Sequence, residues 1–349
     1  MKKELKKLFV DKEMLSVSDF MEYALYHPVD GYYMNEHKKI GRSGDFLTSP
    51  KVSPVFAKLI AGYCLDYWKK GEAEIRFMEI ACGDGAFASQ FLSFLREMDE
   101  GISRNLEYIG IEKSHFHQKL FRERVDFHSI ELYQSISDIP SFRGIIFSNE
   151  WLDAFPVRII EKSGEEMNEI MLCLEGDEIK EVKINRVDES INDYLKEYSL
   201  KPQQGERMEV PISMEREFKG LMGKLEKGIL LTIDYGSVEL DGNCEKRGTL
   251  RGFKAHHLIE DYYKYPGEMD ITYSVPFHVL RKIGEKAGAK ELLFQRQDEF
   301  LMEQGVYGEL KNCTSRDPFS PDKKWNRKIM QLMEGSGMSR LFHVLVQKK

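Results

Sequence analysis

The chain has 349 residues, of which 42% are hydrophobic and 31% charged, which is the composition of a globular protein with one large domain or about two of ordinary size. Its net charge of -7 and pI near 5.8 argue against nonspecific nucleic-acid binding, which depends on neutralising phosphates. No apolar run approaches the roughly 18 residues of a membrane span, and the cysteines and histidines lack the spacings of common metal sites or of a disulfide framework.

Residues 1–70 predict a helical region that precedes the main domain. The basic stretch 1–10 has no apolar segment or cleavage site of a secretory signal, so we expect a cytoplasmic protein. Residues 13–27 predict a helix that is capped by the polar residues of 16–19 and stopped by His27-Pro28. A second helix is predicted from Ser53 to Trp68.

Between these two helices lies a glycine-punctuated loop, residues 40–50, with a charged pair and two hydroxyls. Loops of this kind either connect elements or close over a ligand. We expect this loop to close over a bound cofactor, with contacts from Gly44, Asp45, Phe46 and Thr48.

The most informative stretch is residues 75–85, where an apolar run contains Glu79 and leads to Gly83 and Gly85. This pattern predicts a strand, a tight nucleotide-binding turn and a helix, because the glycines leave the backbone open to a ligand. With Ala88 the spacing is a loose G-x-G-x-x-A, which suits NAD, FAD or S-adenosylmethionine. An ordinary strand-to-helix turn is the alternative.

Glu79 favours S-adenosylmethionine among these cofactors. Beside the pyrophosphate of a dinucleotide this carboxylate would face like charge, whereas S-adenosylmethionine has no phosphate and carries a sulfonium and an ammonium group. We also expect Glu79 to fix the glycine turn by accepting backbone N–H bonds. The next predicted strand ends at Glu112, whose carboxylate would suit the ribose hydroxyls of either cofactor; the alternative is a charge at a helix N-terminus.

Farther along the chain, short apolar runs alternate with amphipathic segments, which predicts βαβ units and a parallel sheet. Turn signals at Ser163-Gly164 and Gly176 predict instead an antiparallel insertion within residues 157–184. The predicted strands of the main sheet are residues 75–80, 106–111, 125–128, 144–148 and 229–234, followed by 291–295 and 341–347.

The strand 144–148 opens directly into Asn149, Glu150 and Asp153. Ligands of open α/β sheets bind beyond the carboxyl ends of the strands, so we expect this loop to face the same crevice as the glycine turn. The two carboxylates, with Asn149 beside them, form a candidate catalytic set that would hold a guanidinium or an amine. The alternative is a capped helix start with an exposed acidic turn.

Several longer motifs occur along the chain in this order: Tyr26-His27-Pro28 with Gly31-Tyr32-Tyr33, Gly41 to Phe46 with Thr48-Ser49-Pro50, Glu79 with Gly83 and Gly85, Asn149 to Val157, Ile233 to Gly236, Gly248 to Phe253 with His256, Pro266-Gly267, and Asp270-Ile271-Thr272. With these motifs the chain resembles, over most of its length, the class I S-adenosylmethionine-dependent methyltransferases of the MidA group, whose mitochondrial members act as assembly factors for respiratory complex I. Positions that depart from the family pattern are Lys51, Ala81-Cys82 and Ser274 to Phe277.

The resemblance implies a Rossmann-like α/β methyltransferase sheet that binds S-adenosylmethionine and methylates a protein, with an arginine nitrogen as the favoured acceptor. It also implies a substrate related to a respiratory complex, and it is compatible with a homodimer. The expected division is a helical region over 1–70, the methyltransferase core over 71–156 and 226–349, and a substrate-side insertion over 157–225. A noncatalytic assembly factor with the same fold and an NAD(P)-dependent oxidoreductase remain the alternatives.

Overall fold

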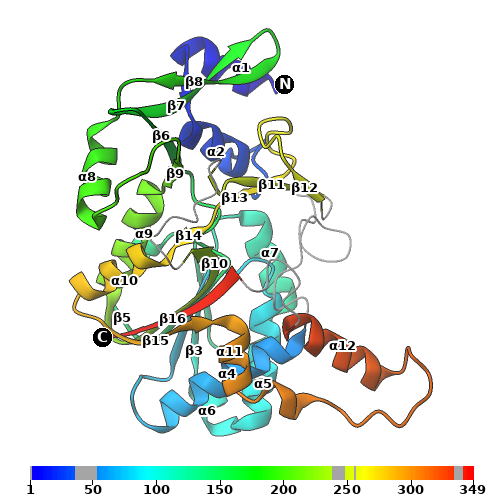
Figure 1. Cartoon of the computed structure of the whole chain (residues 1–349). Helices are drawn as coiled ribbons and strands as arrows, with labels where there is room; N and C mark the ends of the chain where they lie inside the picture. Colours follow the sequence, from blue (N-terminus) through cyan, green and yellow to red (C-terminus); the bar gives the residue numbers. More distant parts are fainter. Residues whose placement is uncertain (1, 36–52, 238–247, 255–256, 334–340) are drawn as a thin grey trace. The chain divides into compact units, whose positions relative to one another are not determined.

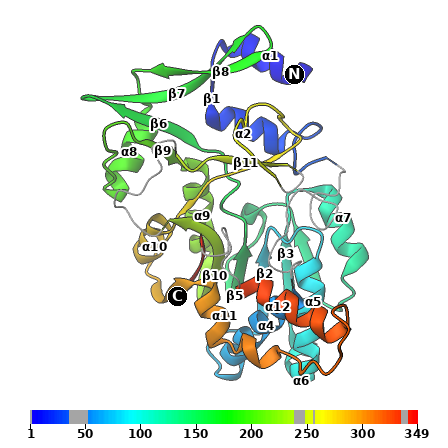
Figure 2. The same ribbon diagram turned by 45° about the vertical axis from the view of Figure 1, so that its right-hand side comes forward.

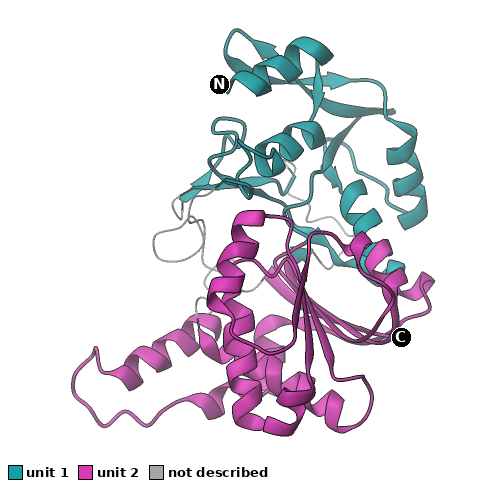
Figure 3. Cartoon of the chain, turned by 180° about the vertical axis from the view of Figure 1, so that it is seen from behind, with its two compact units in different colours: residues 1–46, 152–219, 236–283 teal, residues 47–151, 220–235, 284–349 magenta. Residues whose placement is uncertain are grey.

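The computed structural model describes residues 2–35, 53–237, 248–254, 257–333 and 341–349, and the chain splits into two compact units (Figure 1, Figure 3). Unit 1 contains residues 1–46, 152–219 and 236–283, and unit 2 contains residues 47–151, 220–235 and 284–349. The sequence-based division placed 226–349 in one core, whereas residues 236–283 cluster with unit 1.

The centre of unit 2 is a sheet with the strand order β15-β16-β10-β5-β2-β3-β4. An eighth strand, β14, pairs with the end of β10, and these paired residues belong to unit 1. The strands from β10 to β4 pair in parallel with one another, and β10, β5, β2 and β3 follow one another across the sheet in Figure 2. The strand β16 is antiparallel to both β10 and β15. The bounds are β2 Arg76–Ile80, β3 Glu107–Ile111, β4 Ile130–Tyr133, β5 Phe142–Asn149, β10 Leu225–Ser237, β14 Val275–Pro276, β15 Lys290–Arg296 and β16 Phe342–Lys348.

The predicted strands of this sheet are confirmed with one exception. Residues 125–128 are not a strand, because Val125 caps the C-terminus of α7 (His115–Arg124) and its N–H bonds to Phe121 O. The strand that pairs with β3 begins only at Ile130. An apolar residue at a helix end was therefore taken for the start of a strand.

The helices of unit 2 pack on the sheet through an aromatic core. Phe77 of β2 stacks on Phe91 with ring centroids 4.4 Å apart, and Phe87 stacks on Phe147 of β5 at 4.6 Å. The helix predicted from Ser53 is confirmed, since the Ser53 hydroxyl accepts the Val55 N–H at its start. The helices are α4 Pro54–Lys69, α5 Ala86–Met98, α6 Glu100–Asn105, α7, α11 Gln297–Glu303 and α12 Pro321–Met333, with short 3-10 turns η1 Ile136–Asp138 and η2 Val306–Glu309.

Unit 1 is built on a five-stranded antiparallel sheet, which confirms the predicted antiparallel insertion. Its strands are β1 Leu15–Ser16, β6 Arg158–Ser163, β7 Glu166–Glu175, β8 Glu178–Ile184 and β9 Arg207–Val210. A three-stranded sheet consists of β11 Arg251–Lys254, β12 His257–Ile259 and β13 Asp270–Thr272. The helices are α1 Lys3–Lys12, α2 Val17–Tyr26 and α8 Glu189–Tyr198; α9 Ile212–Lys224 and α10 Phe277–Lys286 each cross a unit boundary.

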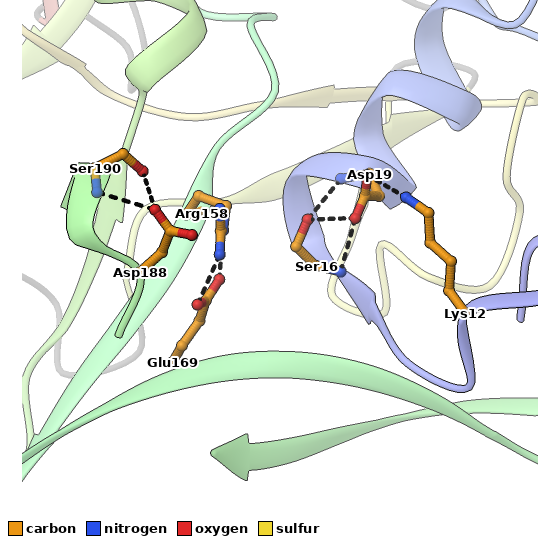
Figure 4. A network of polar contacts seen from close by, with 7 residues as sticks. All are labelled: Lys12, Ser16, Asp19, Arg158, Glu169, Asp188 and Ser190. Atoms are coloured by element: carbon orange, nitrogen blue, oxygen red, sulfur yellow. Dashed lines mark hydrogen bonds and ion pairs between the residues drawn. The ribbon is translucent and has the colours of Figure 1, made fainter. Parts of the chain in front are cut away.

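The helix predicted over 13–27 is shorter than expected. Ser16 and Asp19 form a capping box, so α2 starts at Val17, and Glu13 ends the separate helix α1. Nearby, Arg158 donates to buried Glu169 across the sheet, with Nη2 to Oε2 at 2.7 Å, and Asp188 caps α8 through Ser190 (Figure 4). The capping contacts fix the starts of α2 and α8, and the Arg158–Glu169 pair joins β6 to β7.

Across the described part of the chain, no helix combines the length and the apolar character that crossing a membrane requires.

Candidate functional site

The glycine turn lies at the carboxyl end of β2, in the middle of the sheet of unit 2. Ile80, the last residue of β2, is level with Ile111 of β3 and with Ser148 of β5. Along the chain, β3 and β4 are added on one side of β2, and β5 and β10 are added on the other side. This is a topological switch point, where open α/β sheets bind their ligands.

The two glycines of the turn have different roles. Gly83 has φ +54, and a Cβ added to it would find only Ala81 O, at 4.0 Å, so this side of the backbone is open to a ligand. Gly85 has φ +73, and its Cβ would lie 2.7 Å from Val125 Cγ2 and 3.0 Å from Phe121 Cδ2. Gly83 therefore fits close approach of a cofactor, whereas Gly85 allows α5 to start against α7.

Glu112 fixes the glycine turn. Its carboxylate is 8% exposed and accepts the Gly83 N–H at 2.9 Å and the Ser114 N–H at 2.7 Å. We had expected Glu79 to hold the turn in this way, so that expectation was wrong. Each oxygen of Glu112 keeps lone-pair capacity for a further donor, so its role toward ribose hydroxyls stays a prediction.

Glu79 is bonded instead to the next strand. The Tyr108 hydroxyl of β3 donates to Glu79 Oε2, and the Glu79 side chain is 5% exposed. Burial raises the pKa of Glu79 to about 8. The hydrogen bond from Tyr108 lowers this pKa, and the negative charges of Asp84 and Glu112 raise it. Sequence reasoning missed Tyr108, because pairing it with Glu79 requires the register of β2 and β3.

Asn149 and Glu150 follow β5 directly. Glu150 has φ +50, a left-handed conformation that is costly for a residue with a Cβ, and its N–H bonds to Ile233 O at 3.0 Å. Asn149 Nδ2 donates to Glu150 Oε1 at 2.8 Å, while Asn149 Oδ1 is buried and has no hydrogen-bond partner among the described residues. The structure thus brings these two predicted residues together as a carboxylate that is hydrogen-bonded to an amide.

A buried aspartate supports this loop from the neighbouring strand. Asp234 of β10 is fully buried, and its carboxylate accepts the Trp151 N–H at 3.1 Å and the Tyr235 N–H at 2.9 Å. Asp234, which sequence analysis grouped with the motif Ile233 to Gly236, therefore fixes the backbone that follows Glu150.

Asp153, the third predicted catalytic residue, belongs to unit 1. It is 6% exposed, and its carbonyl accepts the Tyr273 N–H at 3.0 Å. In the same unit, Arg251 Nη2 donates to Ser274 Oγ at 2.8 Å. Gly44, Asp45, Phe46 and Thr48 lie outside the described residues, as does His256.

Within the described ranges, no group of three or more His, Cys, Asp or Glu side chains could hold a metal ion. The candidate site consists of the open backbone at Gly83 and four side chains: the acids Glu79, Glu112 and Glu150 and the amide of Asn149. These acidic side chains fit a cationic ligand without phosphates, and the open side of Gly83 gives such a ligand access to the turn.

Comparisons with known proteins agree with this chemistry. A family model described as "Putative S-adenosyl-L-methionine-dependent methyltransferase" matches residues 59–295. The mitochondrial protein arginine methyltransferase NDUFAF7 of Xenopus tropicalis is 26% identical over 328 residues, which cover 85% of this chain and 73% of that protein. The Homo sapiens NDUFAF7 is 23% identical over 338 residues, which cover 85% of this chain and 71% of that protein.

Two solved structures from Burkholderia thailandensis share the fold. One, bound to S-adenosyl-homocysteine, has a TM-score of 0.85 at 24% identity and covers 99% of this chain and 91% of that chain. The other has a TM-score of 0.82 at 25% identity and covers 99% of this chain and 90% of that chain. The predicted α/β fold with a Rossmann-like sheet is confirmed.

Proposed function

The chain belongs to the family of S-adenosyl-L-methionine-dependent methyltransferases, and from that premise we propose that its methyl acceptor is an arginine side chain of a protein. The family match confirms the predicted cofactor and decides against an NAD(P)-dependent oxidoreductase. The names of the curated relatives, protein arginine methyltransferases, support arginine as the acceptor.

The observation that carries the proposal is the pair formed by Asn149 and Glu150. Asn149 holds one carboxylate oxygen of Glu150, and its own Oδ1 is an acceptor without a partner among the described residues. A guanidinium presents five N–H donors in a planar fork and no acceptor. The Glu150 carboxylate and the Asn149 amide oxygen, on consecutive residues, offer acceptors for that fork, and the charge of Glu150 balances its cation.

In this reaction the bound cofactor supplies an electrophilic methyl group on a sulfonium. The open backbone at Gly83 and the carboxylate of Glu112 would hold the cofactor at the end of β2. Glu150 would orient the guanidinium and localise a lone pair on the attacking nitrogen. A C–N bond forms as the C–S bond breaks, the bonding pair goes to sulfur, and the surplus proton of the nitrogen leaves afterwards. Positioning of this kind contributes on the order of 7 to 11 kcal/mol.

The first experiment is to find the acceptor. The enzyme and radiolabelled S-adenosylmethionine are added to a native cell lysate, and the labelled protein is identified by mass spectrometry. Acid hydrolysis should release the label as methylarginine. Label recovered on another amino acid would refute the arginine proposal, and the absence of any transfer under conditions of proven cofactor binding would favour the noncatalytic alternative.

The second experiment tests Glu150 with that acceptor. Glu150→Gln keeps the size and the bond from Asn149 but removes the charge, so we expect methyl transfer to fall at least about 100-fold, roughly 2.7 kcal/mol, with cofactor affinity unchanged within a few-fold. Glu97→Gln, on the exposed face of α5, is the matched control and should behave as the parent. Parental transfer by Glu150→Gln would make Glu150 a structural turn residue.

The acceptor's identity also tests two further parts of the proposal. The family resemblance supports a substrate that belongs to, or assembles with, a respiratory complex. A cytoplasmic location of the enzyme is a separate part of the proposal. Cell fractionation of the enzyme and the name of the labelled protein check both. Analytical ultracentrifugation tests the homodimer.

A further inference from the structure

Three acids surround the glycine turn, and they differ in how their charge is balanced. Asp84 Oδ1 lies 2.7 Å from Arg124 Nη1, and Glu112 accepts two backbone N–H bonds. Glu79 is hydrogen-bonded to a neutral phenol, Tyr108, and no described residue gives it a cationic partner. Glu79 is therefore the acid of this turn whose charge nothing in the described structure balances.

The surroundings of Glu79 explain why its charge is costly. Its register partners on the two neighbouring strands are Gly110 and Phe147, which offer no polar side chain. The side chain of Cys82 fills the space above Gly110, where a Cβ would lie 2.9 Å from Cys82 Sγ. An acid enclosed in this way favours its neutral form.

Glu79 changes protonation just above neutral pH. Burial raises the pKa of Glu79 to about 8. Burial also raises the pKa values of the Tyr108 phenol and the Cys82 thiol well above their usual range, so both stay protonated. Asp84 and Glu112, from the turn and from the end of β3, add negative charge that opposes ionisation of Glu79.

We propose that Glu79 and Tyr108 form a proton-holding pair, so that binding of the cationic cofactor expels one proton from the site. Before binding, Glu79 carries the proton while Tyr108 donates to its Oε2. The positive charge of the cofactor then favours the carboxylate, and the proton passes to solvent or buffer. Tyr108 is a positioning residue in this step, because its hydroxyl stabilises the ionised form of Glu79.

The consequence is a cofactor affinity that rises with pH below about 8, by close to tenfold per pH unit where Glu79 is fully protonated. The free protein should show the opposite trend. A carboxyl whose pKa is raised by folding binds more protons folded than unfolded, so the stability of the free protein falls as pH rises from the ordinary Glu range towards 8. Cofactor binding should remove this loss.

The test is calorimetric titration of S-adenosylmethionine in two buffers of different ionisation enthalpy, at several pH values from 6 to about 8.5. At pH 6 to 7 the parent should release close to one proton more per binding event than Glu79→Gln, which carries a permanently neutral amide, and about half a proton more at pH 8. Glu79→Gln should bind more weakly with a flatter pH profile, yet be more heat-stable than the parent at the upper pH without cofactor. Titration of the cofactor's own amine is common to both proteins and cancels in the difference.

Tyr108→Phe shows whether Tyr108 affects the protonation of Glu79 or makes only a structural contact. Loss of the hydroxyl removes a bond that favours the carboxylate, so the rise of affinity should move to higher pH rather than disappear. A folded parent that binds the cofactor but releases the same number of protons as Glu79→Gln overturns the proposal. So would a uniform loss of affinity in Tyr108→Phe with no movement of the pH profile.

Discussion

Gly83→Val tests the glycine turn most directly, because its effect on stability and its effect on cofactor binding can be predicted separately. The left-handed φ of +54 imposes a backbone cost of about 1 to 2 kcal/mol on a residue with a Cβ. A Cβ at this position meets no atom beyond its chain neighbours nearer than Ala81 O at 4.0 Å, so we expect the fold to survive. The same open space is where we place the cofactor, and a branched side chain would fill it.

Gly176, in the turn between β7 and β8, provides the matched control. It has φ +64 and, like Gly83, no atom that would obstruct a Cβ within 4 Å, but it belongs to unit 1, whereas the turn at β2 belongs to unit 2. Gly176→Val should therefore show a comparable loss of unfolding free energy in urea and parental cofactor binding. Gly83→Val should lose at least about 100-fold in affinity, roughly 2.7 kcal/mol.

Titration calorimetry measures the affinity, and thermal shift measures the stabilisation that the cofactor gives. At 100 times its dissociation constant the cofactor should stabilise the parent and Gly176→Val by about 2.7 kcal/mol, and Gly83→Val hardly at all. A folded Gly83→Val that binds within a few-fold of the parent would refute the assignment of this turn as the place where the cofactor approaches the backbone.

Two further predictions concern stability. Ala81 has φ +54, so Ala81→Gly should raise the unfolding free energy by about 0.5 to 1 kcal/mol, and an unchanged or lower midpoint in urea would contradict the strain. His278 has both ring nitrogens buried without a partner among the described residues, and burial, with Lys282 nearby, lowers its pKa to about 4. The unfolded chain then binds the extra proton first, so stability should fall as pH drops from about 6.5 to 4, by at most about 3 kcal/mol. His278→Leu should flatten this part of the pH profile, and equal slopes for both proteins would refute it.

Local motifs explain which parts of the site could be predicted from the sequence. The turn at Gly83 and the loop at Glu150 follow short, largely apolar segments, so each could be placed at a strand end. The roles of Glu79 and Glu112 could not be assigned correctly, because they depend on which residues of β2 and β3 lie level. Burial of Glu79 against Phe147 likewise comes from a strand far along the chain.

Two predicted element boundaries were wrong for a related reason. An apolar residue such as Val125 suits both the end of a helix and the start of a strand. In the structure Val125 caps α7 and packs beside Gly85. Glu13 and Leu15 fit a helical pattern, but the pairing of Leu15 with Leu172 draws the chain into a strand. In both cases a distant contact overrides a local preference.

The position of β16 has a consequence for biosynthesis. Residues 342–348 form the strand between β10 and β15, so the sheet that carries the cofactor site has a gap until this segment has been synthesised. A nascent chain on the ribosome exposes the unpaired edges of β10 and β15 for as long as translation of the intervening residues takes, which invites wrong pairing. Both units are also assembled from three separated segments, so neither can be expressed as one continuous fragment. Chaperone dependence and sensitivity to C-terminal deletion should therefore go together in this protein.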